Sequence, residues 1–171
     1  LAAVHSATGS AKEARNCMLE ATKRARNNWR MWESFLSICL QLRDVAGAIS
    51  ALRRFAELDK FSLITEKVLG LLTATVVGDR DGLYEGRTGK AFIRQLDSFF
   101  TLLTSKHTSE PCFWYFYAEL QEHQGQWVKS LESRFKQARA AQSKLWEEND
   151  PERFVTRLED LCECFASLDR V

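Results

Sequence analysis

Apolar residues recur at helical spacing along most of the chain, and they predict pairs of antiparallel helices. Between residues 29 and 59, two successive segments each carry an apolar face, at Trp32, Phe35, Leu36 and Cys39 in the first and at Val45, Ala48, Ile49, Leu52 and Phe55 in the second. Ala48 is small, which allows two paired helices to approach closely there. The pattern predicts an all-α fold built from antiparallel helix pairs.

A second pair of helices is expected between residues 62 and 106, with an unusually long connector at residues 78–89. Its apolar positions are Leu63, Ile64, Val68, Leu71, Leu72 and Val76 in the first helix and Phe92, Leu96, Phe99 and Leu103 in the second. Thr88 is a plausible N-cap for the second helix. Because bulky side chains replace the small Ala, we expect this pair to lie further apart.

A third pair is expected at residues 111–143, followed by a last helix at residues 150–169. Pro111 suits the first position of a helix and Gly125 the turn between the two helices. The expected apolar positions are Trp114, Tyr117 and Ala118 in the first helix, Leu131, Phe135 and Ala138 in the second, and Phe154, Leu158, Leu161, Phe165 and Leu168 in the last. Asp150 and Pro151 start that last helix, which we expect to cap the stack.

Residues 29–61 resemble a tetratricopeptide repeat, with Trp32, Asp44 and Ala48 at characteristic positions. Shifted back by about 34 residues, the same pattern makes residues 1–28 a truncated repeat. The Trp29, Trp32 and Glu33 cluster, followed by DVAGAISALRRF and LWEENDPERFVTRL, is similar to the C-terminal end of the tetratricopeptide-repeat protein twenty-seven family. The resemblance implies one right-handed α-solenoid domain over residues 1–171, from an intracellular scaffold without enzymatic activity.

Composition sets limits on the partners of the chain. Its 171 residues are 45% hydrophobic with a net charge of +1, which is typical of one soluble domain and gives no field that favours nucleic acid or anionic lipid. No apolar run is long enough to cross a membrane. Five cysteines without a paired framework predict a reducing compartment, cytoplasmic or nuclear. The chain begins at Leu1 rather than Met, which suggests a piece of a longer protein, and we expect a monomer.

Four patterns that resemble catalytic or ligand sites fail on residue type or on spacing. GLYEGRTGK has Tyr84 where a P-loop needs its first Gly, and Ala91 follows the Lys. Cys112 and His123 lie eleven residues apart on one predicted helix, roughly 16 Å. Glu119, Glu122 and His123 lack the second His of a zinc helix, and Cys162 and Cys164 point apart. We therefore predict no catalytic residue, no metal and no cofactor.

The resemblance implies a partner-binding groove lined by the second, fifth, ninth, twelfth and thirteenth residues of each first helix. These are Arg30, Glu33, Ser37, Leu40 and Gln41 in one repeat, and Cys112, Tyr115, Glu119, Glu122 and His123 in another. Repeats that hold a chaperone C-terminal tail use Lys and Asn there, and these rows contain neither. We expect a peptide or helix of a protein partner, with Tyr115 as an aromatic anchor and Arg30 pairing with a carboxylate.

Two alternatives stay open. Lys23, Arg24, Arg26 and Arg30 surround Trp29, a combination that suits single-stranded RNA, although Glu20 and Glu33 and the near-neutral total charge argue against it. The segment could also be a purely structural cap of a longer solenoid.

Overall fold

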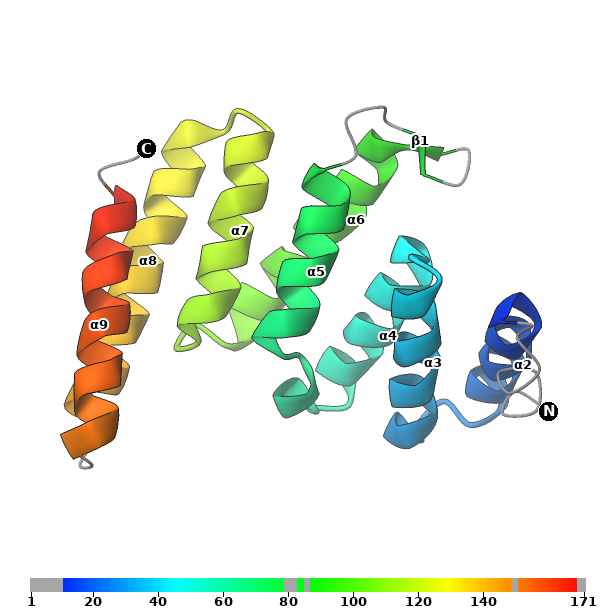
Figure 1. Cartoon of the computed structure of the whole chain (residues 1–171). Helices are drawn as coiled ribbons and strands as arrows, with labels where there is room; N and C mark the ends of the chain where they lie inside the picture. The colour runs from blue at the N-terminus through cyan, green and yellow to red at the C-terminus, as the bar shows by residue number, and fades with distance from the viewer. Residues whose placement is uncertain (1–10, 79–82, 85–86, 149–150, 169–171) are drawn as a thin grey trace. The chain divides into compact units, whose positions relative to one another are not determined.

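The computed structural model describes residues 11–78, 83–84, 87–148 and 151–168, and it is almost entirely helical (Figure 1). The helices in chain order are α2 (Ala11–Arg24), α3 (Trp29–Gln41), α4 (Val45–Glu57), the short 3-10 helix η1 (Phe61–Leu63), α5 (Glu66–Val77), α6 (Gly89–Lys106), α7 (Pro111–His123), α8 (Trp127–Trp146) and α9 (Pro151–Leu168). Two short antiparallel strands, β1 (Leu83–Tyr84) and β2 (Arg87–Thr88), lie in the connector before α6. The predicted all-α fold of antiparallel helix pairs is confirmed.

The chain divides into two compact units, residues 1–95 and residues 96–171, which are described separately. Length and resemblance predict one domain, and the repeat boundaries within it stay a prediction. Residues 1–10 of the expected truncated repeat, the centre of the P-loop-like segment and Asp150 lie outside the described residues, as does the side chain of Thr88.

The core of unit 1 lies between α3 and α4, as the apolar spacing predicts. Phe35, Cys39, Ala48, Leu52 and Phe55 are all at most 1% exposed. Burial of these side chains removes apolar surface from water and supplies most of the stability of the pair. Trp32 is only half-buried, and its indole Nε1 donates to the backbone carbonyl of Arg26 at 2.8 Å, which fixes the turn between α2 and α3.

Asp44 joins three helices at the turn between α3 and α4. Its carboxylate accepts the backbone amide of Gly47 at 2.9 Å, which caps α4, and it pairs with Arg15 of α2 at 2.6 Å. Gly47 packs against this group so closely that a Cβ there would lie 2.5 Å from Asp44 Oδ2 and 2.6 Å from Cys39 Sγ. The close approach expected at Ala48 therefore also needs the absence of a side chain at the residue before it.

The third predicted helix starts later than expected and is rotated. Thr65 caps α5 by accepting the amide of Val68, so Leu63 and Ile64 precede the helix rather than lie in it. Leu69, Leu72, Thr73 and Val76 face the interior, whereas Leu71 is 51% exposed. The placement of Leu71 on the buried face is wrong, because Thr73 rather than an apolar residue takes one of the inward positions.

The same turn motif occurs in both units, 82 residues apart (32 to 114, and 43 to 125). In unit 2, Trp114 Nε1 donates to the carbonyl of Thr108 at 2.9 Å, as Trp32 does to Arg26. Gly125 has a φ of 71°, and Arg43 has a φ of 55°. A backbone amide then closes each turn onto the carbonyl five residues earlier, at 2.8 Å in both cases. This equivalence aligns α3 and α4 with α7 and α8, residue by residue.

Unit 2 begins within α6, whose predicted apolar face is confirmed. Leu96, Phe99 and Leu103 are fully buried, and Phe100 stacks on Tyr117 of α7 with ring centroids 5.8 Å apart. Pro111 is the first residue of α7, as predicted.

The predicted apolar face of α8 is wrong. Leu131 is 37% and Phe135 58% exposed, while the side of α8 that packs inward carries polar residues: Ser130, Ser133, Arg134 and Gln137. Only Ala138 of the predicted face is buried, in a cluster with Ala141, Leu145, Leu161 and Cys164. The last two residues belong to α9, which packs along α8 and exposes Phe154, Leu158 and Phe165 on its predicted apolar face.

Candidate functional site

A cavity of about 430 Å³ lies in unit 1 between α5 and the turn that joins α3 to α4. Most of its lining is apolar or small: Cys39, Leu40, Val45, Ala48, Leu71, Leu72 and Ala74. Arg43, Asp44, Thr75 and Gly78 complete the wall. A volume of this size is within the range of pockets that take small ligands or inserted side chains.

The cavity opens at the positions where the repeat register predicts a binding groove. The inward residues Leu69, Leu72, Thr73 and Val76 of α5 follow Trp32, Phe35, Leu36 and Cys39 of α3 at a constant interval of 37 residues. With that interval, Ala74 and Gly78 take the ninth and thirteenth positions of α5, while Leu40 takes the twelfth of α3. Because Ala74 and Gly78 project so little from the backbone, space is left at these groove positions.

Arg43 supplies the uncompensated charge at the cavity. The carboxylate of Asp44 is buried and already accepts from Arg15 and from the amide of Gly47. The thiol of Cys39 is neutral, because burial first, and then the negative charge of Asp44, raise its pKa to about 12. Arg43 is exposed and forms no ion pair with any residue that the structure describes. The cavity therefore combines an apolar wall with one available guanidinium group.

The groove row predicted on α3 is open to solvent. Arg30, Glu33, Ser37 and Gln41 are all exposed, and Leu40 is half-buried at the cavity wall. The Arg30 guanidinium lies over the ring of Trp29, 5.3 Å from its centroid, so it is held near the start of the helix. This row and the cavity lie on the same unit and could contact one bound segment.

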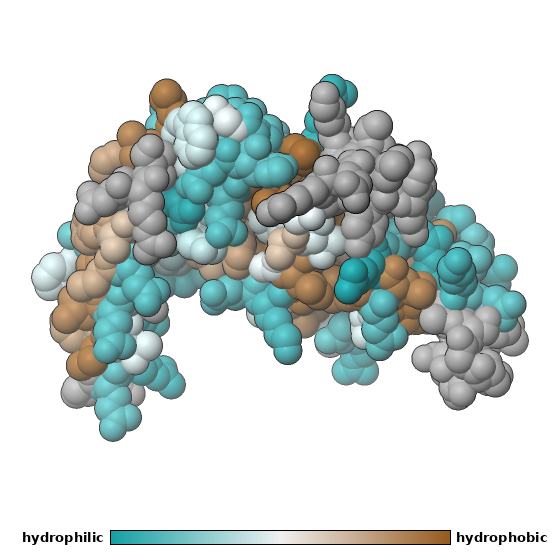
Figure 2. Space-filling view, turned by 45° about the horizontal axis from the view of Figure 1, so that its top comes forward, coloured by the Kyte–Doolittle hydropathy of each residue, from teal (hydrophilic) through white to brown (hydrophobic). Residues whose placement is uncertain are grey.

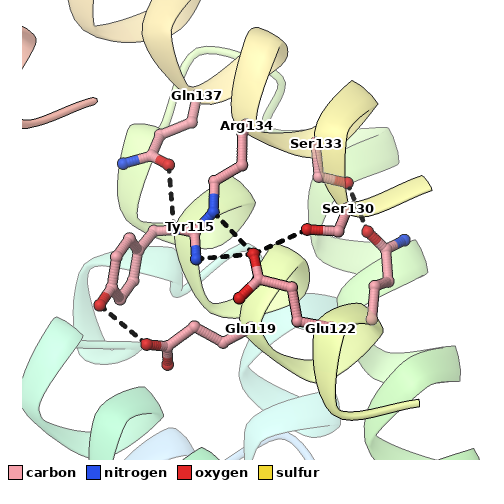
Figure 3. A network of polar contacts seen from close by, with 8 residues as sticks. Tyr115, Glu119, Glu122, Ser130, Ser133, Arg134 and Gln137 are labelled. Carbon is pink, nitrogen blue, oxygen red and sulfur yellow. Dashed lines mark hydrogen bonds and ion pairs between the residues drawn. The ribbon is translucent and has the colours of Figure 1, made fainter. Parts of the chain in front are cut away.

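The groove row predicted on α7 is engaged with α8 instead (Figure 3). Arg134 of α8 donates from Nε and Nη2 to Glu122 Oε1 at 3.1 and 3.0 Å, and Ser130 donates to the same oxygen at 2.7 Å. The Arg134 guanidinium also covers the ring of Tyr115, 4.8 Å from its centroid.

The tyrosine of this row has its hydroxyl occupied as well. Tyr115 donates to Glu119 at 2.8 Å, and burial, followed by the nearby Glu119, raises the pKa of Tyr115. His123 is exposed and Cys112 is half-buried at the two ends of the row. Three of the predicted residues, Tyr115, Glu119 and Glu122, thus already have partners within the chain.

The contribution of α5 and Arg43 to the site has no clear signal in the sequence. Ala74, Thr75 and Gly78 carry no functional group that attracts attention, and the late start of α5 hides its register. Thr65, the N-cap of α5, follows Asn28, the N-cap of α3, by the same interval of 37 residues, and this match gives the alignment and with it the groove positions.

The part of the chain that the structure describes offers little that suggests a metal site, a nucleotide-binding loop or a membrane span. No group of three His, Cys, Asp or Glu residues there could hold a metal ion. All five cysteines are free thiols. The P-loop-like segment enters α6 from a two-residue strand pair. Within the described residues no helix is both long and apolar enough to cross a membrane.

The chain has paired helices and repeated turns, which is the helical repeat architecture that tetratricopeptide proteins also have. It is similar to the tetratricopeptide repeat protein 27 homolog of Dictyostelium discoideum, with 29% identity over 125 residues. That match covers 73% of this chain and 14% of the relative, so the chain spans a small part of the longer protein.

No family model matches the chain. The crystal structure of MamA aligns with 99% of this chain and 95% of its own length, at 12% identity and a TM-score of 0.47.

Proposed function

We propose that the chain is a non-enzymatic scaffold that binds a peptide or helix of a partner protein on the exposed row of α3, with one side chain inserted into the cavity beside α5. The observation that carries this proposal is the position of the cavity, which opens at the groove positions of α3 and α5. An apolar pocket beside polar surface is the usual arrangement at the energetic centre of a protein interface.

The chemistry of the cavity indicates which partner sequence it selects. Leu40, Leu71 and Leu72 favour an aliphatic or aromatic side chain, and burial of one such side chain stabilises a complex by about 1.5–3 kcal/mol. Arg43 at the wall favours an acidic residue next to it, through a charge-assisted hydrogen bond. We expect a segment in which a large apolar residue lies beside Asp or Glu.

The proposal also covers the class of partner and the cellular location. The absence of Lys and Asn from the α3 row argues against a chaperone C-terminal tail as the partner. Five free thiols suit a reducing compartment, so we propose an intracellular location.

RNA binding remains a second candidate, with less support. Of the basic residues expected to contact RNA, Lys23 pairs with Glu20 at 2.6 Å and Arg30 covers the ring of Trp29. Both the charge and the aromatic surface are therefore partly used within the chain. RNA binding would show an affinity that falls steeply with salt and is lost in Arg24→Ala or Arg26→Ala.

The proposal is tested by selection from a displayed library of random peptides. The library is panned on the wild-type chain and, in parallel, on Ala74→Trp, in which an exposed side chain fills the cavity from the surface. Ser50→Trp, an exposed position on α4, is the matched control. We expect wild type and Ser50→Trp to enrich the same apolar–acidic motif and Ala74→Trp to lose it. Enrichment that is identical on all three proteins would contradict the proposal.

A further inference from the structure

Helix α8 buries polar residues at positions where its counterpart α4 buries apolar ones. With the interval of 82 residues, the buried residues Ala48, Leu52 and Phe55 of α4 correspond to Ser130, Arg134 and Gln137 of α8. Those polar side chains are buried and bonded: Ser130 and Arg134 to Glu122, and Gln137 to Cys164. The apolar side of α8, in contrast, points away from α7.

The apolar surface of α8 continues onto α9. Val128, Leu131 and Phe135 form a stripe along α8, and Phe154, Leu158 and Phe165 form one along α9, all exposed. Each stripe borders the buried cluster between the two helices, since Phe135 precedes Ala138 by three residues and Leu158 precedes Leu161 by three. The two helices run antiparallel (Figure 1), so the equal offset of three residues places both stripes on the same side of the pair. We call these six residues the α8–α9 face.

The α8–α9 face is large enough to bind a partner. Large apolar surface gathers over the α8 and α9 region in the space-filling view (Figure 2). From the exposed fractions, the six side chains present roughly 500 Å² of apolar area, which is the size of the largest patch on a typical soluble monomer, and such patches often bind a partner.

Unit 1 shows how the corresponding surface of α4 is covered. Ile49, the counterpart of Leu131, is 2% exposed, whereas Leu131 is 37% exposed. Arg53, the counterpart of Phe135, donates to the carbonyl of Gln95 in α6 at 3.1 Å. In unit 1 the first part of α6 therefore bonds to the side chain at the position that Phe135 occupies in unit 2. Among the described residues, no helix takes that place on α8.

We propose that the α8–α9 face binds an amphipathic α-helix from a partner polypeptide, which lies along α8. Its apolar stripe would extend the buried cluster formed by Ala138, Ala141, Leu145, Leu161 and Cys164. This binding surface is separate from the cavity of unit 1 and does not depend on it.

Charges along the two edges select a helix over other occupants. The exposed charged residues on this part of α8 are mostly basic: Lys129, Glu132, Lys136 and Arg139, of which Lys136 lies over the ring of Trp114 in α7, 4.9 Å from its centroid. On α9, Glu159 and Glu163 are exposed. A helix with acidic residues on one flank and basic residues on the other complements both edges at once. An anionic membrane would be repelled by the α9 edge, and so would a uniformly acidic peptide.

The test uses a synthetic helix of about 18 residues with leucines on one stripe, Glu on one flank and Lys on the other. A peptide of the same composition in scrambled order, without a continuous stripe, is the control. Binding to the 171-residue chain is measured by fluorescence anisotropy, and the mass of the chain by light scattering. Phe135→Glu and Leu158→Glu place a charge on exposed positions of the face. Ser50→Glu does the same at an exposed position of α4 and is the matched control, whereas Leu71→Glu places a charge in the cavity of unit 1.

We expect the striped peptide to bind with a micromolar Kd, and both substitutions on the face to weaken binding about tenfold or more, while Ser50→Glu leaves it unchanged. Helicity and melting temperature show whether each variant is folded. Three results would overturn the proposal: equal binding of the scrambled peptide, loss of binding only in Leu71→Glu, or no binding at about 1 mM. A doubled mass that Phe135→Glu abolishes would overturn it as well, because the face would then bind a second copy of the chain.

Discussion

Arg134 of α8 pairs with Glu122 of α7 at 3.0 Å, in the place where the equivalent helices of unit 1 have Leu52 and Leu40. The side chain of Arg134 is 7% exposed, so the pair has largely lost the hydration that each charge would have in water. Such a pair is destabilising to break but need not be more stable than an apolar pair.

The pair can be tested with the residues that unit 1 uses. Arg134→Leu alone leaves a partly buried carboxylate, and Glu122→Leu alone leaves a buried guanidinium, so each should lower the free energy of unfolding by about 2–4 kcal/mol. The double variant should lose about 1–3 kcal/mol less than the sum of the two. Urea denaturation of the four proteins measures this coupling, and additive losses would show that the pair is not energetically linked.

The turns of the two units give a matched prediction about backbone strain. Arg43 and Gly125 occupy the same position with φ values of 55° and 71°. A residue with a Cβ in this conformation costs about 1–2 kcal/mol. Arg43→Gly should therefore stabilise the chain by about 1 kcal/mol, and Gly125→Ala should destabilise it by a similar amount. Thermal melting distinguishes the two, and shifts of the same sign would be inconsistent with the assigned turns.

Gly47 allows α4 to pack against the turn that precedes it. In Gly47→Ala, the added methyl would lie within 2.6 Å of both Asp44 Oδ2 and Cys39 Sγ, so something has to move. We expect a loss of about 1–3 kcal/mol in the free energy of unfolding. Ser50→Ala, on the exposed side of the same helix, should change it by less than about 0.5 kcal/mol. Equal stability of the two variants would mean that the close contact is not present in solution.

The thiol of Cys39 should be unreactive in the folded protein. Burial and the charge of Asp44 raise its pKa from 9.0 to about 12, so the folded state holds the proton more tightly than the unfolded chain. This contribution to stability is fully present below pH 9.0 and is lost as the pH rises towards about 12. Cys39→Ser should flatten that part of the stability profile.

Alkylation at pH 8 provides a second readout for the same residue. Iodoacetamide should modify the exposed Cys162 rapidly and Cys39 only after denaturation, as read by mass spectrometry of the digested protein. Equal rates at the two cysteines would contradict the buried, neutral thiol.

The helices could be predicted from the sequence because apolar spacing, Pro111 and the repeated Trp positions all indicate the same elements. The sequence did not allow a prediction of which side of α8 packs inward. Val128, Leu131 and Phe135 have the periodicity of a buried stripe, and a periodic stripe does not indicate whether it packs within the chain or against something else. The inward residues, led by Arg134, look like an exposed face until their partners on α7 are known.

The candidate site was predictable only in part. The α3 row followed from the repeat register, and the structure leaves it exposed. The cavity did not follow from the register, because it arises from the small size of Ala74 and Gly78 rather than from any functional group. Tyr115 stood out as an aromatic anchor, but its engagement by Arg134 depends on a residue nineteen positions later in the chain.

The most direct test of the proposed function is a crosslink from the inserted side chain. A peptide enriched on the wild-type chain is synthesised with benzoylphenylalanine in place of its apolar anchor, irradiated with the chain, and the adducts are mapped by mass spectrometry. Binding in the cavity predicts adducts on Leu40, Leu71 or Ala74, which Ala74→Trp should abolish. Adducts on the α8–α9 face, or scattered over the surface and unchanged in Ala74→Trp, would contradict it.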